Sequence, residues 1–215
     1  SVRNEKIEFQ PYLLDVELFS NSKINDLIMD GGPITKKMIV SGKLKSILEK
    51  YRSSGMQFYN INVIQKNNIF KDYWILNMYE TNFEVIDFIK SEFYETENVF
   101  NLIKKIDIKS IDEFLKFKSE IELKDYPYGF IISKIALKDD ITLDFFSLLY
   151  VECGIKYVVS EKLKQEIEDA GCTGIEFQPI EMTHQKKIKS LLFVILVNYF
   201  SYRVEHCCYF SFLDY

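Results

Sequence analysis

Hydrophobic residues follow two patterns along the chain: short β-branched runs typical of strands, and stretches with helical spacing. The runs Met38–Val40 and Tyr157–Val159 are apolar and favour strands. After each run, leucine and isoleucine recur at intervals of three or four residues, starting at Leu44 and at Leu163, which predicts one amphipathic helix in each place. The chain is therefore predicted to be α+β, with a mixed or antiparallel sheet and short helices.

The two strand–helix segments are near copies of each other. Residues 40–61 and 159–180 align without a gap, and nine of the 22 positions are identical. Ser41 and Ser160 fall at the start of the predicted helices, where a serine hydroxyl accepts a hydrogen bond from a free backbone N–H. A returning strand follows each helix. We interpret the copies as a structural repeat of two similar strand–helix–strand units.

The segment between the copies is predicted to contain further strands and one helix. Two apolar runs predict a hairpin whose bend lies near Asn67 and Asn68. Ser110 begins a predicted helix, and Glu113 completes a capping box with it. The apolar stretch 143–153 is compatible with either a helix or a strand.

The chain has no linker rich in glycine or serine. We therefore expect residues 1–182 to form one α+β domain that contains the repeats at 38–64 and 157–182. Pro179 predicts that the last strand of the second copy ends there or lies at a sheet edge. Residues 183–215 are aromatic and carry four Lys or Arg against two Asp or Glu. They are expected to form an apolar extension, either an extra helix and strand or a poorly specified tail.

The net charge of −5 bears on which class of molecule the chain binds. It disfavours free nucleic acid and anionic membranes and favours a basic protein. The longest apolar run, Leu191–Phe200, is about half of what a membrane span needs, so it predicts a buried strand or helix. Four cysteines without C-x-x-C spacing indicate reduced thiols in a cytoplasmic protein. The triplet His206–Cys208 is too compact to surround one metal ion, and no cofactor is predicted.

The sequence contains no phosphate-binding loop, no Gly-x-Ser-x-Gly and no His-Glu-x-x-His. His184 and His206 both lie in the extension, so neither is a persuasive general base, and the chain is not expected to be an enzyme. Acidic side chains are plentiful, and among lysines they are typical of a solvated surface. The acidic candidates for partner binding are Glu92, Glu95, Glu97, Asp139, Asp140, Glu166, Glu168 and Asp169.

Several pieces of the chain, taken in order, resemble a known family. The closing segment 155–180 is similar to the closing motif of the eleventh numbered immunity family of bacterial polymorphic toxin systems, once a domain of unknown function. A hydrophobic strand followed by an Asp-x-x-x-Ser element also resembles the middle of that family. The resemblance runs from about Met38 to Met182, and the forty-third immunity family, which ends similarly, is a close rival. The positions that carry it are Trp74, Asp87, Ser91, Ser160, Gly174 and Phe177.

The resemblance implies a non-catalytic cytoplasmic protein that binds and neutralises a cognate toxin encoded by a neighbouring gene. Many such toxins are nucleases with basic active sites, which an acidic surface could block. Two alternatives stay open. A peptide- or small-ligand-sensing module would use the apolar extension for docking. An unrecognised hydrolase would gather Asp87, Ser91, His184 or His206 around a pocket.

Overall fold

The computed structural model describes residues 6–9, 11–29, 37–98, 101–124, 126–151, 154–180 and 192–197. The chain forms two compact units. The first unit comprises residues 1–80, 162–177 and 195–215, and the second comprises residues 81–161 and 178–194. Each unit is built on strands with helices packed against them, so the predicted α+β class is confirmed. A single domain over residues 1–182 stays a prediction.

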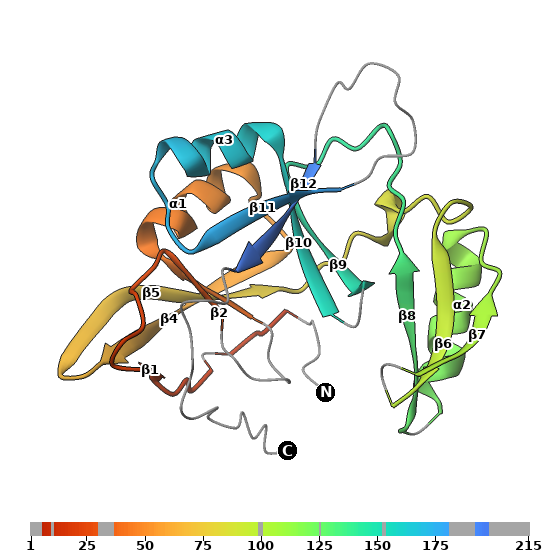
Figure 1. Cartoon of the computed structure of the whole chain (residues 1–215), viewed down its shortest axis with the longest axis horizontal. Helices are drawn as coiled ribbons and strands as arrows, with labels where there is room; N and C mark the ends of the chain where they lie inside the picture. Colours follow the sequence, from red (N-terminus) through yellow and green to blue (C-terminus); the bar gives the residue numbers. More distant parts are fainter. Residues whose placement is uncertain are drawn as a thin grey trace. The chain divides into compact units, whose positions relative to one another are not determined.

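The first unit contains a five-stranded sheet in the order β1-β4-β5-β3-β2 (Figure 1). Its strands are β1 (Val16–Leu18), β2 (Leu27–Met29), β3 (Met38–Ser41), β4 (Met56–Gln65) and β5 (Asn68–Met78). β4 and β5 form the predicted hairpin, with its turn at Lys66 and Asn67. Strand β1 pairs with β4 in parallel, whereas the other neighbours are antiparallel, so the sheet is mixed.

Helix α1 (Gly42–Tyr51) covers one face of this sheet and buries Leu44, Ile47 and Leu48, as the helical spacing predicts. Burial of each of these side chains stabilises the fold by about 1.5–3 kcal/mol. Because side chains alternate along a strand, the neighbours of the α1-facing positions form a second cluster on the opposite face. Its buried members are Leu18, Ile28, Ile39, Ile61, Val63, Tyr73 and Ile75.

A seven-stranded sheet has the order β11-β12-β10-β9-β8-β6-β7. Its strands are β6 (Glu92–Glu97), β7 (Asn101–Ile106), β8 (Tyr128–Lys134), β9 (Phe145–Val151), β10 (Gly154–Ser160), β11 (Ile175–Pro179) and β12 (Leu192–Val197). The ambiguous stretch 143–153 thus supplies a strand, β9. Strand β11 stands first in the sheet and ends at Pro179, so the prediction from that proline is confirmed. The apolar extension contributes β12, and the rest of it lies outside the described residues.

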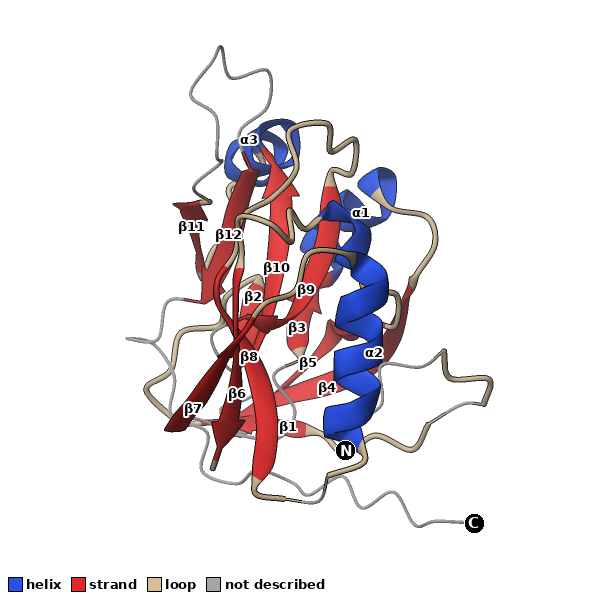
Figure 2. Cartoon of the chain, turned by 90° about the vertical axis from the view of Figure 1, so that its right-hand side faces the viewer, coloured by secondary structure: helices blue, strands red, loops and turns tan. Residues whose placement is uncertain are grey.

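The core of the second unit is aromatic. Helix α2 (Ile111–Glu122) lies against β8 (Figure 2). The 3-10 turn η1 (Phe83–Val85) supplies Phe83. The fully buried ring of Phe114 lies between 4.9 and 5.8 Å from four other phenylalanine rings. As predicted, Ser110 caps α2: its hydroxyl accepts a hydrogen bond from the backbone N–H of Glu113 at 3.2 Å. The Glu113 carboxylate accepts one from the N–H of Lys109 at 2.7 Å.

The two predicted copies are β3–α1–β4 and β10–α3–β11, where α3 spans Glu161–Asp169. The repeat begins earlier than the gapless alignment indicates. Strand β2 precedes β3 and pairs with it in antiparallel fashion, with Leu27 opposite Val40. Strand β9 precedes β10 in the same way, with Phe145 opposite Val159. Each copy is therefore a unit of two antiparallel strands, a helix and a returning strand.

Side-chain contacts are repeated as well as the backbone. In each helix a lysine forms an ion pair with the glutamate four residues later, and it also lies over a phenylalanine of the returning strand. The ion pairs are Lys45–Glu49 at 2.7 Å and Lys164–Glu168 at 3.0 Å. The corresponding distances from Nζ to the ring centroid are 5.3 Å to Phe58 and 5.8 Å to Phe177. The sequence identities at these positions thus reflect the same local structure.

Candidate functional site

A carboxylate just before β2 joins the two copies within the first unit. Asp26 accepts hydrogen bonds from the Ser41 hydroxyl at 2.7 Å and from the backbone N–H and hydroxyl of Thr173 at 2.8 and 3.1 Å. Lys43 Nζ lies 3.1 Å from the same carboxylate. Burial opposes ionisation of Asp26, but the hydrogen bonds from Ser41, Thr173 and Lys43 outweigh it and lower its pKa. Thr173, in the closing segment 155–180, is therefore a structural anchor.

The glycine that follows Thr173 is required by space and by backbone conformation. Gly174 has φ +81°. A Cβ at this position would lie 2.6 Å from the carbonyl oxygen of Leu27 and 2.6 Å from Cβ of Asn25. A side chain at this position would clash in addition to being strained. Phe177, three residues later, lies under the ammonium of Lys164, so this part of the motif also has an internal role.

Ser160 makes the contacts in the second copy that Ser41 makes in the first. Its hydroxyl donates to the Asp144 carboxylate at 2.6 Å, and its backbone N–H donates to the Asp144 carbonyl at 2.9 Å. The corresponding backbone bond, from Ser41 to Asp26, is 2.8 Å long. The sequence predicts that both serines lie at helix starts, and the structure confirms this position. Their aspartate partners were not predicted.

Helices α1 and α3 lie side by side in antiparallel orientation (Figure 1). Lys43, in the first turn of α1, donates to the carbonyls of Ala170 and Gly171 just past the end of α3, at 3.4 and 3.1 Å. Lys162, at the equivalent position of α3, lies 5.2 Å from the ring of Tyr51 at the end of α1. The helix ends therefore make reciprocal contacts. Lysines near the last carbonyls of a helix also favour its dipole.

The Asp-x-x-x-Ser element forms a tight turn in the second unit. The Ser91 hydroxyl donates to the Asp87 carbonyl at 2.7 Å and accepts from the N–H of Ala136 at 2.9 Å, and the side chain is buried. The Asp87 carboxylate pairs with Lys90 at 2.9 Å. Burial opposes ionisation of Asp87, but hydrogen bonds from Lys90 lower its pKa. Ser91 thus fastens the turn to the neighbouring segment rather than facing solvent as a nucleophile.

Trp74 lies on β5 and is half-buried. The ammonium of Lys45 lies 4.8 Å from the indole ring, and the indole N–H donates to Asp72 at 3.5 Å. The indole ring therefore packs under Lys45 of α1 and remains partly accessible to solvent. A lysine held over an aromatic ring contributes about 0.5–1 kcal/mol at such a site.

Lysines neutralise four of the eight acidic candidates, at distances between 2.6 and 3.2 Å. These pairs are Glu92–Lys105, Glu95–Lys124, Glu166–Lys50 and Glu168–Lys164. Hydrogen bonds from Lys50 and then Tyr51 lower the pKa of Glu166. Asp169 accepts a hydrogen bond from Gln165 at 2.8 Å. Asp139 and Asp140 are exposed in a turn, and Glu97 is half-exposed at the end of β6. The candidates therefore do not form one continuous acidic cluster within either unit.

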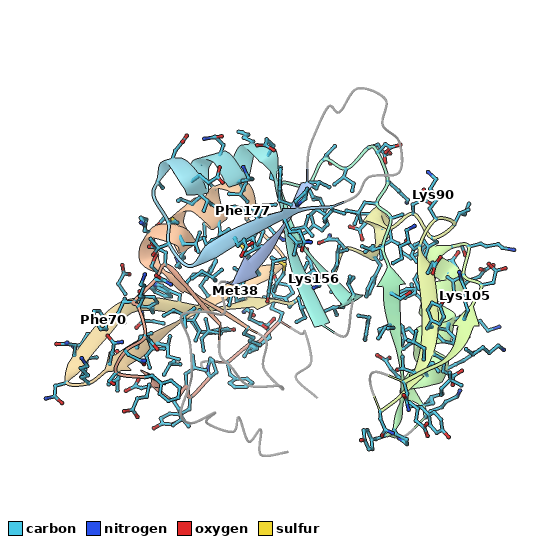
Figure 3. The ribbon with its side chains drawn as sticks, in the orientation of Figure 1. Met38, Phe70, Lys90, Lys105, Lys156 and Phe177 are labelled. Atoms are coloured by element: carbon cyan, nitrogen blue, oxygen red, sulfur yellow. The ribbon has the colours of Figure 1, made fainter. Side chains whose placement is uncertain are left out.

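A shallow hollow of about 500 Å³ lies in the second unit. It is lined by residues 88–92 and 105–108, including Lys90 and Lys105, which Figure 3 labels. Ser91 lines the hollow, but its hydroxyl is held in the turn described above. Asp87 is not among the residues that line it. His184 and His206, the two histidines of the hydrolase alternative, lie outside the described residues, as does the triplet His206–Cys208. In the described part of the chain, no three His, Cys, Asp or Glu side chains are placed to hold a metal ion.

These features define an α+β protein whose motif residues hold the fold together. The chain matches the model of the Imm11 immunity protein family over residues 6–182 and belongs to that family. The expectation of the eleventh immunity family is thereby confirmed. A toxin-neutralising immunity role follows from this membership. No curated protein and no solved structure matches the chain. Across the described ranges, no helix has the length and apolar character needed to span a membrane.

Proposed function

We propose that the chain is a non-catalytic immunity protein that neutralises its cognate toxin by binding it directly in the cytoplasm. The match to the Imm11 immunity protein family over residues 6–182 carries this proposal. The internal roles of Ser91, Ser160 and Gly174 support it, because these motif residues act in the fold and leave recognition to the surface. The toxin is the product of a neighbouring gene.

We further propose that the toxin is a nuclease and that carboxylates of the second unit face its basic active surface. Asp139, Asp140 and Glu97 support this part, because none of them lies within ion-pair distance of a described lysine or arginine. Exposed unpaired carboxylates steer a basic partner and raise the association rate, and salt weakens that effect. The lysine-paired candidates contribute less to such steering.

Co-expression with the toxin domain tests the proposal. The C-terminal domain of the protein encoded beside this chain is produced with and without it, and growth is measured together with complex formation by size exclusion. A stable complex that restores growth is expected. Toxicity that persists without a complex would contradict direct neutralisation. The nuclease part is tested by the association rate at low and high salt, and a rate independent of salt would contradict electrostatic steering.

A further inference from the structure

Strand β7 is the last strand of the seven-stranded sheet and pairs, among the described strands, with β6 alone (Figure 1). Its side chains are exposed from Asn101 to Lys105, and Leu102 and Ile103 are each 51% exposed. An edge strand leaves a row of backbone N–H and C=O groups free to pair with another extended chain. Two exposed apolar side chains on adjacent positions point to opposite faces of the strand, so a partner can contact both faces.

One end of β7 lies next to exposed aromatic residues. Asn101 is opposite Glu97, which in turn is opposite Tyr128 on β8. Tyr126 is 81% exposed and its hydroxyl donates to the side chain of Asn98 at 3.1 Å, so the ring is exposed and held in place. We call Tyr126 and Tyr128 the aromatic corner; their exposed fractions are 81% and 47%. Leu123, shortly before them in the chain, is 87% exposed. Tyrosines held in this way are typical anchors of protein interfaces.

The shallow hollow lies at the other end of β7, because residues 105–108 line it. Ile89, also in its lining, is 79% exposed. The aromatic corner, β7 and the hollow therefore follow one another along a single edge of the second unit. We call this surface the docking strip. Six residues of β7 extend over about 20 Å, which matches a short added strand.

The charges along β7 indicate what kind of strand fits. Lys105 pairs with Glu92 at 3.2 Å. Lys104 is exposed, and the described residues place no carboxylate within ion-pair distance of it. Lysine on an edge strand often blocks unwanted pairing. A second copy of this chain would place the lysines of two β7 strands close together, and like charges across a strand pair are destabilising. A strand with a carboxylate near Lys104 and apolar neighbours fits instead.

We propose that the toxin adds an extended segment to β7, with a carboxylate beside Lys104 and side chains in the hollow and on the aromatic corner. This inference rests on the proposed immunity function and names the surface that performs it. The backbone pairing supplies much of the affinity, while the side chains on either face supply specificity. Lys104 then excludes strands without an acidic residue and so selects the cognate toxin.

Hydrogen exchange and three variants test the proposal on the complex of the full chain with the toxin domain. Amides of residues 101–106 are expected to exchange more slowly in the complex. Ile103→Asp and Lys104→Glu are each expected to weaken binding at least about tenfold, the loss typical of an interface anchor. Ile69→Asp is the matched control, because Ile69 is also on a strand and is 56% exposed, but belongs to the first unit.

Two results would overturn the inference while leaving the immunity function intact. The first is a complex that forms with unchanged exchange at residues 101–106 and unaltered affinity of both β7 variants. The second is self-association of the chain through β7 without toxin, abolished by Ile103→Asp. Failure of the unmodified chain to bind or neutralise the toxin contradicts the proposed function itself.

Discussion

The hydroxyl of Ser41 donates a 2.7 Å hydrogen bond to the carboxylate of Asp26, which lies fifteen residues earlier in the chain. Ser160 and Asp144 repeat this relationship at 2.6 Å, and Asp144 lies sixteen residues earlier than Ser160. The aspartate is thus fixed to the start of the helix in both copies. In the first copy the same carboxylate also anchors Thr173, so it connects the loop before β2 to the turn after α3.

Asp26→Asn is expected to lower the free energy of unfolding by about 1–3 kcal/mol at pH 7, because several hydrogen bonds to a charged acceptor are weakened at once. The pKa of Asp26 is lowered in the folded protein. Its contribution is therefore present above the unfolded carboxyl pKa of about 3.9 and is lost as the pH falls through the lower folded value. Urea unfolding at pH 7 and pH 3 measures this. A difference between the two proteins that stays constant with pH would contradict the ionic contribution.

Gly174→Ala is expected to destabilise the protein by about 2–5 kcal/mol, since left-handed strain adds to overpacking. Gly171→Ala is the matched control. Gly171 also has a positive φ, +62°, but no atom lies within 4 Å of a Cβ built there. Strain alone predicts a loss of about 1–2 kcal/mol for this control. Thermal and urea unfolding compare the variants, and equal losses would show that the close approach of Leu27 is not decisive.

Ser91→Ala is expected to lower the free energy of unfolding by about 1–3 kcal/mol, because the buried N–H of Ala136 loses its acceptor. The folded variant is expected to bind and neutralise the toxin normally. Ser119→Ala serves as control, since its exposed hydroxyl donates within α2 to Leu115. That change is expected to cost less than about 0.5 kcal/mol. Loss of toxin neutralisation in a stably folded Ser91→Ala protein would instead assign Ser91 a direct role.

Replacing Asp139 and Asp140 together by Asn is expected to slow toxin association several-fold at low salt and to have little effect at high salt. The matched control replaces Glu168 by Gln and Asp169 by Asn, which changes the net charge equally but in the first unit. Association rates measured at both salt concentrations test this. Equal slowing by the two double variants would indicate that net charge matters rather than the position of the carboxylates.

Local features of the fold were predictable from the sequence. The cap at Ser110, the turn at Asn67 and the strand end at Pro179 each depend on a few neighbouring residues, whose hydrogen-bonding and backbone preferences act over short distances. The repeat was predictable because its identities include the serines at the helix starts, one buried leucine in each helix and the left-handed Gly55 and Gly174. The choice of strand for residues 143–153 depended on burial on both faces, which periodicity does not reveal.

Contacts between distant segments were not predictable. The segment from Asp26 to Ser41 is one residue shorter than the segment from Asp144 to Ser160. An alignment without gaps therefore cannot be extended back from Val40 to match the two aspartates. Glu166 was selected as a surface carboxylate, yet Lys50, 116 residues away, neutralises it at 2.6 Å. The exposed edge at β7 depends on the order of strands in the sheet, and a run of alternating residues carries no information about that order.

The reciprocal contacts of α1 and α3 have the arrangement of an isologous dimer interface, in which each partner offers the same patch to the other. Lys43 reaches the end of α3, and Lys162 reaches the end of α1. Two copies of a shorter polypeptide with one such helix would form the same arrangement by self-association. Fusion of two such protomers would place both halves in one chain. Each half would then be free to diverge.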